Sequence, residues 1–97
     1  MFEIQQTSHY RAWFAVLRDR VAKGRITARL ERVELGNFGD VGPVGEGISE
    51  LKLDFGPGYR VYFTRRGDTI ILLLCGGDKS SQSRDIALAK RIASELE

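Results

Sequence analysis

Three strand-like runs joined by two short turns, at residues 50–54, 59–63 and 70–74, limit the folds open to this chain more than any other feature. Gly56-Pro57-Gly58 separates the first two runs, and Arg65-Arg66-Gly67-Asp68 separates the last two. Glycine and proline supply the backbone angles of tight turns, and the short gaps favour neighbouring antiparallel strands. The sequence therefore predicts a small antiparallel sheet.

The first two runs alternate between apolar and polar residues, so each strand should have one apolar and one polar face. Leu51 and Leu53 share the apolar face with Val61. The polar face is predicted to carry Lys52, Arg60 and Tyr62, with Arg65 or Arg66 at its rim and Lys79 beyond the last strand. The run at 70–74 is apolar on both faces, which is typical of a central strand.

Helices are predicted before and after this sheet. A short strand at residues 2–5 precedes a first helix with an aromatic stripe, which Thr7 or Ser8 would cap and Gly24 would break or bend. A second helix presents one apolar face and ends at Gly36-Asn37. A final helix follows the serines after Lys79. The apolar residues predicted for these helices are Tyr10, Trp13, Phe14, Leu17 and Val21, then Ala22, Ile26, Leu30 and Val33, and finally Ile86, Ala89, Ala93 and Leu96.

Residues 36–47 hold five glycines and one proline, and we expect them to form a loop. The predicted order is therefore β-α-α-β-β-β-α. This is an α+β fold in which residues 1–97 form one domain, with the helices on one face of the antiparallel sheet.

Composition excludes several classes of function. No apolar run approaches the ~20 residues of a membrane-spanning helix, and the first residues lack the features of a signal peptide, so we expect a cytoplasmic protein without a membrane partner. One cysteine and one histidine, Cys75 and His9, predict neither an internal disulfide nor a metal site. The glycine-rich segment follows no predicted strand, so it does not match a dinucleotide-binding motif and no cofactor is expected.

Positive charge is concentrated in the second helix. Residues 18–32 contain six basic and two acidic side chains, a local net charge of +4 in a chain whose net charge is +2. Arg25, Arg29 and Arg32 fall within about 60° of one another at ~100° per residue. This stripe predicts contact with a polyanion or an acidic partner protein, although solvated helix faces of this kind are also common.

The predicted polar face suits RNA cleavage without a metal ion. Attack by the 2′-hydroxyl of RNA requires positive charge around the phosphate and groups that move protons. Arginine binds phosphate well, and lysine supplies a compact charge. The alternative is that these charges only solvate an exposed sheet face.

Five sequence segments resemble the RelE/ParE superfamily of bacterial type II toxins, and within it the HigB-like group called addiction module killer proteins. They are Gly36–Asp40, Gly45–Gly47 with Glu50-Leu51-Lys52, Gly56–Phe63, Leu73–Lys79, and the set Gln82, Asp85, Ile86 and Ala89. The resemblance implies two N-terminal helices, an antiparallel sheet and a C-terminal helix. It also implies a toxin that cleaves mRNA on the ribosome and so inhibits translation.

Specific roles follow from this resemblance. It implies Lys52, Arg60 and Lys79 as catalytic residues of an mRNA interferase. We predict that further contacts to RNA or phosphate come from Tyr62, Arg65, Arg66, Arg25, Arg29 and Arg32. The implied partners are a cognate antitoxin, the ribosome and mRNA, with operator DNA reached only through the antitoxin. Two alternatives stay open: a ParE-like inhibitor of gyrase, and an antitoxin-binding co-repressor without catalysis.

Overall fold

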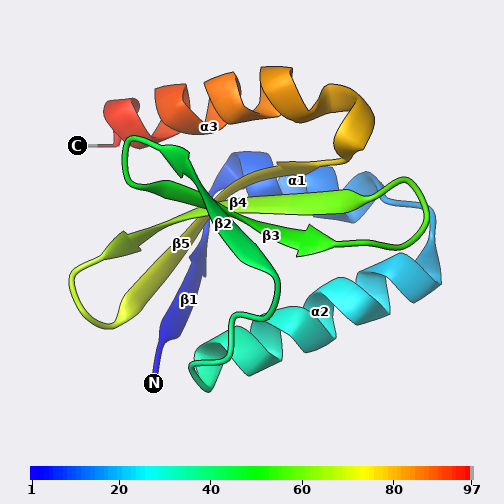
Figure 1. Cartoon of the computed structure of the whole chain (residues 1–97), viewed down its shortest axis with the longest axis horizontal. Helices are drawn as coiled ribbons and strands as arrows, with labels where there is room; N and C mark the ends of the chain where they lie inside the picture. The colour runs from blue at the N-terminus through cyan, green and yellow to red at the C-terminus, as the bar shows by residue number, and fades with distance from the viewer. Residues whose placement is uncertain (97) are drawn as a thin grey trace.

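The computed structural model describes residues 1–96 as an α+β fold in which a five-stranded sheet lies between two helical layers (Figure 1). The elements in chain order are β1 (Glu3–Gln6), α1 (Ser8–Val16), α2 (Arg20–Glu34), β2 (Val41–Gly45), β3 (Ile48–Leu53), β4 (Tyr59–Arg66), β5 (Ile70–Gly77), the 3-10 turn η1 (Lys79–Ser81) and α3 (Gln82–Glu95). None of the helices within residues 1–96 has the length and apolarity needed to cross a membrane.

The sheet has the strand order β1-β5-β4-β3-β2. The pairs β3–β4 and β4–β5 are antiparallel, as the short connections predict. The pair β2–β3 is also antiparallel, whereas β1 lies parallel to β5. Gly56 and Gly58 in the β3–β4 turn have φ of 55° and 77°, a region that favours glycine. The predicted central position of β5 is confirmed, because β1 and β4 flank it.

The predicted element order is wrong at the glycine-rich segment, which contains the strand β2. The observed order is β-α-α-β-β-β-β-α. Val41 pairs with Leu51 and Pro43 with Ser49, so β2 extends the sheet beyond β3. Proline is tolerated there because an edge strand has one side without ladder hydrogen bonds. Pairing with β3 therefore outweighs the poor strand propensity of the glycines.

The boundary between the first two helices also differs from the prediction. Gly24 lies inside α2, and the chain breaks at residues 17–19 instead. The Asp19 carboxylate accepts a hydrogen bond from the Ala22 backbone N–H at 3.1 Å and so caps the start of α2. Val21 then points outward, and the expectation that it is part of the buried stripe is wrong.

Helices cover both faces of the sheet, so the prediction of helices on one face is also wrong (Figure 1). On the first face α1 and α2 pack over the sheet, and Trp13 is half-buried there. On the second face Ala89 and Ile92 of α3 pack against strand residues. The strand residues of the second cluster are Ile48, Tyr62, Leu72, Leu74 and Cys75. The face that the sequence indicated as polar is therefore largely interior.

Candidate functional site

The predicted polar face begins with two cross-strand pairs near the β3–β4 turn. Lys52 lies directly opposite Arg60, and Glu50 lies opposite Tyr62. Residues two apart on a strand share a face, so the prediction that Lys52, Arg60 and Tyr62 lie together is confirmed. Because α3 covers part of this face, burial increases along it. Lys52 is half-buried, Arg60 is 5% exposed and Tyr62 is fully buried.

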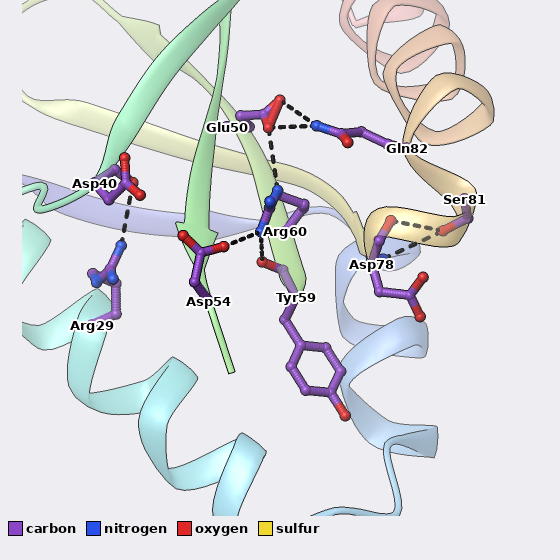
Figure 2. Close-up of polar contacts among 9 residues, drawn as sticks. All are labelled: Arg29, Asp40, Glu50, Asp54, Tyr59, Arg60, Asp78, Ser81 and Gln82. Atoms are coloured by element: carbon purple, nitrogen blue, oxygen red, sulfur yellow. Dashed lines mark hydrogen bonds and ion pairs between the residues drawn. The ribbon is translucent and has the colours of Figure 1, made fainter. Parts of the chain in front are cut away.

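Arg60 is enclosed by oxygen acceptors (Figure 2). Its Nε lies 3.3 Å from Glu50 Oε1, and its Nη1 lies 3.2 Å from Asp54 Oδ1. Nη1 also donates to the backbone carbonyl of Tyr59 at 2.9 Å. Two carboxylates and a carbonyl thus fix the position of this guanidinium and neutralise its charge.

Glu50 connects this arrangement to α3. Gln82, the first residue of α3, donates from Nε2 to both carboxylate oxygens of Glu50, at 2.7 and 3.2 Å (Figure 2). Glu50 itself is only 4% exposed. A buried carboxylate needs partners of this kind, because an unpaired charge away from water is costly. The contact joins residues 32 positions apart and holds the start of α3 against the sheet.

Lys79 lies on the short segment that leads into α3. Asp78 caps the turn η1 by accepting from the Ser80 backbone N–H at 2.8 Å. The hydrogen bond from the Ser80 hydroxyl is the main reason that the pKa of Asp78 is lowered. The Lys79 side chain is exposed, but its aliphatic part crosses Gly58, where an added Cβ would lie 2.8 Å from Lys79 Cγ. Gly58 therefore lets Lys79 lie beside the β3–β4 turn.

Tyr62 does not reach the surface. Its hydroxyl is buried and has no hydrogen-bond partner within the described part of the chain. Burial raises the pKa of Tyr62, and the negative charges of Glu50 and Asp85 raise it further. Tyr62 therefore contributes to the core beneath α3, and its hydroxyl is not exposed for the RNA contact that the sequence predicted.

The arginine stripe of α2 lines a groove beside the β3–β4 turn. The groove has a volume of ≈ 300 Å³. It is lined by Arg25, Ala28, Arg29, Arg32, Leu53, Asp54 and Phe55. The Arg25 guanidinium lies 4.5 Å from the centroid of the Phe55 ring, and Arg29 Nη1 donates to the Asp40 carbonyl at 3.4 Å (Figure 2). Partial burial and the positive charge of Arg32 lower the pKa of Arg29. Asp54 borders this groove and also contacts Arg60. The arginine stripe of α2 therefore lies next to the polar face that carries Lys52 and Arg60.

Arg65 and Arg66 lie away from these clusters. They end β4, about 17 Å and about 20 Å from Arg60 at ~3.3 Å per residue. The Arg65 guanidinium covers the Phe2 ring at 4.8 Å from its centroid. Arg66 lines a different cavity, of ≈ 460 Å³, together with Gln6 and His9. The structure therefore does not bring these two predicted RNA contacts next to Lys52.

The chain is similar to a curated bacterial protein. The chain is 46% identical over 94 residues to a protein of Haemophilus influenzae (strain ATCC 51907 / DSM 11121 / KW20 / Rd) described only as uncharacterized. The alignment covers 97% of this chain and 95% of that protein. This chain belongs to the same family as the Haemophilus protein. No family model matches the chain, and no solved structure matches it.

The sequence did not predict the contacts through which Glu50, Asp54 and Gln82 take part in this site. Glu50 lies two residues before Lys52 on β3 and Asp54 two residues after it, just past the end of the strand, so their place on the polar face was visible as a pattern. Gln82 gave no such signal, because its contact depends on how α3 crosses the sheet. Within residues 1–96, no group of three or more His, Cys, Asp or Glu side chains is placed to hold a metal ion.

Proposed function

We propose that this chain is the toxin of a type II toxin–antitoxin module, in the HigB-like group of the RelE/ParE superfamily. Its proposed activity is cleavage of mRNA on translating ribosomes without a metal ion, which arrests translation in the cytoplasm. The resemblance of five sequence segments supports this proposal. The α+β fold, with three helices and a mostly antiparallel sheet, is compatible with it.

One structural observation carries the proposal: five cations surround the β3–β4 turn without a carboxylate partner. They are Lys52, Lys79, Arg25, Arg29 and Arg32, and none of them forms a salt bridge within residues 1–96. Positive charges that outnumber the nearby carboxylates favour binding of a polyanion. A phosphate backbone that runs along this surface supplies the missing negative charge.

The proposed chemistry uses these cations for charge stabilisation. When the 2′-hydroxyl of the RNA attacks the neighbouring phosphorus, negative charge builds up on the phosphate oxygens. Lys52, opposite Arg60 on β3, and Lys79, beside Gly58 of the β3–β4 turn, are the residues that we assign to supply positive charge to such a group. The chain offers no pair of histidines for acid–base catalysis. The ribosome would therefore contribute by holding the RNA in a reactive, in-line geometry.

The proposed partners follow from this activity. A cognate antitoxin would restrain the toxin by covering Lys52 and placing acidic residues opposite the α2 arginines. The antitoxin would also supply contacts to operator DNA, because nothing in the sequence resembles a DNA-recognition helix.

A co-repressor without catalysis is the second candidate. The observation that favours it is the neutralisation of Arg60 by Glu50 and Asp54, which removes one cation from the expected catalytic set. Such a protein would still bind an antitoxin through the cationic groove of α2.

Induced expression separates these functions. The wild type, Lys52→Gln and Lys79→Gln are expressed in a bacterial host without an antitoxin, with Arg91→Gln on the exposed side of α3 as the matched control. We expect growth arrest with transcripts cut at codon positions for the wild type and the control, and loss of both in the two lysine variants. Arrest with intact transcripts and damaged DNA would instead identify a gyrase inhibitor. Absence of arrest in the wild type would favour the co-repressor.

A further inference from the structure

We infer that Arg60 is a positioning residue rather than a phosphate ligand, and that Glu50 is the group that holds it in place. This inference rests on the proposed function, and it changes the role that the resemblance implies for Arg60. The contacts of Arg60 support it. The guanidinium is 5% exposed, and its charge is met by Glu50 at 3.3 Å and Asp54 at 3.2 Å.

A phosphate group would compete with these contacts. To bind Arg60 it would have to approach a side chain that two carboxylates already border, and their negative charge would repel it. Lys52 and Lys79 are more exposed than Arg60. In the described residues neither lysine forms a salt bridge, so no paired carboxylate would repel a phosphate there. The structure therefore assigns phosphate contact to the two lysines.

Glu50 extends the effect of Arg60 across the molecule. One Glu50 oxygen faces Arg60 Nε, and both accept from Gln82 at the start of α3. The turn that carries Lys79 leads directly into this part of α3. Lys52 sits on the strand of Glu50, opposite Arg60. The Arg60–Glu50–Gln82 chain thus fixes the two segments that present the lysines, and its loss would misplace both.

A double-mutant cycle tests this role. Arg60→Gln alone leaves Glu50 as a buried carboxylate without its main counter-charge, and we expect Tm to fall by about 10 °C or more with loss of growth arrest. Glu50→Gln should have a similar effect. The double variant replaces the ion pair with two neutral amides, the one at position 60 being shorter than arginine, which relieves the uncompensated charge. We expect it to regain most of the Tm and transcript cleavage within about tenfold of the wild type.

A surface cation gives the matched comparison. Lys79→Gln should abolish transcript cleavage while leaving Tm within about 2 °C of the wild type, because Lys79 is exposed and exposed charges contribute little to stability. If the double variant recovers its Tm but stays as inactive as Arg60→Gln, then Arg60 contacts the phosphate and the inference is overturned. Recovery of both properties supports the positioning role, and failure to recover Tm overturns the proposed coupling of Arg60 to Glu50.

A second readout does not require cleavage. The nitrogen-15 NMR signal of Arg60 Nε should shift in Glu50→Gln, because the Glu50 carboxylate lies 3.3 Å from this nitrogen. Addition of a short 2′-O-methyl RNA, which cannot be cleaved, should shift the Lys52 and Lys79 side-chain signals and leave that of Arg60 unchanged. A larger shift at Arg60 than at the lysines would overturn the inference. If the wild type causes no growth arrest, the proposed function is wrong. The NMR comparison and the Tm values of the double-mutant cycle do not depend on growth arrest, so they still decide the role of Arg60.

Discussion

At the scale of single residues, two adjacent glycines at the end of β5 determine how closely helices approach the sheet. An added Cβ at Gly76 would overlap the indole ring of Trp13 in α1. An added Cβ at Gly77 would overlap the carboxylate of Asp85 in α3. The two glycines face opposite helical layers: Gly76 allows close packing of α1, and Gly77 allows close packing of α3. The predicted strand ends at residue 74, but in the structure β5 continues through both glycines.

Replacing one of these glycines tests this close packing. Gly76→Ala should destabilise the protein by about 1–3 kcal/mol, because the indole of Trp13 must move to make room for the methyl group. Urea unfolding monitored by circular dichroism measures the change. Gly42→Ala in β2 is the matched control, since its added Cβ would meet Lys52 Nζ at an ordinary 3.6 Å. Equal stability of both variants would show that α1 does not require a glycine here.

Residue-level predictions of the candidate site succeeded where alternation along a strand sufficed. Alternation placed Lys52, Arg60 and Tyr62 on one face, and the register confirms it. It did not reveal that Tyr62 would be buried, because burial depends on the helix that covers the face. For the same reason the contact between Gln82 and Glu50 was not predicted.

At the scale of elements, α2 shows a local sequence signal that tertiary structure overrides. Gly24 was expected to break the helix, yet it lies in the interior of α2 with its own position open to solvent. The capping carboxylate of Asp19 starts the helix earlier, and packing of Ile26 and Val33 against the sheet maintains it. A single glycine costs only about 1 kcal/mol in a helix, which this packing offsets.

Gly24→Ala should therefore stabilise the protein. No atom lies within 4 Å of the added Cβ, so only the backbone entropy of the unfolded chain and the helix propensity change. We expect a gain of about 0.5–1 kcal/mol, seen as a rise in Tm of a few degrees in a thermal melt. A lower Tm would indicate that the helix is interrupted at this residue in solution.

The elements that the sequence predicted well share strong local signals. Gly36, with φ of 94°, follows the end of α2, and the Gly56-Pro57-Gly58 turn joins β3 to β4. The strand β2 was missed because its glycines and Pro43 carry little strand propensity, and pairing with β3 supplies its stability. The placement of α3 was missed although the run at 70–74 is apolar on both faces, a pattern that already indicates cover on both sides.

At the scale of the whole molecule, two hydrophobic clusters share a single sheet. One cluster lies under α1 and α2, and the other lies under α3, but both use residues of β3, β4 and β5. Because the same strands are part of both clusters, neither cluster can lose its strands while the other keeps them. The chain should therefore unfold as one cooperative unit.

Two native probes on opposite faces test this cooperativity. Trp13 reports on the first cluster through its fluorescence, and the thiol of Cys75 reports on the second. Burial raises the pKa of Cys75 to about 12, so at pH 8 the folded protein keeps it protonated and unreactive towards iodoacetamide. We expect the fluorescence transition and the onset of alkylation at the same urea concentration. Alkylation at a clearly lower concentration would show that α3 detaches first.

The parallel pairing of β1 with β5 has a consequence for biosynthesis. The Thr7 hydroxyl, just after β1, donates to the Leu74 carbonyl 67 positions further along the chain. A ribosome adding about 5–20 residues per second leaves β1 without its partner for roughly 3 to 13 s. The sheet therefore closes only when most of the chain has been made. Under the proposed function, the toxin would also cut its own mRNA. If the cut comes before β5 is translated, the chain stays incomplete and inactive, so the toxin would limit its own production.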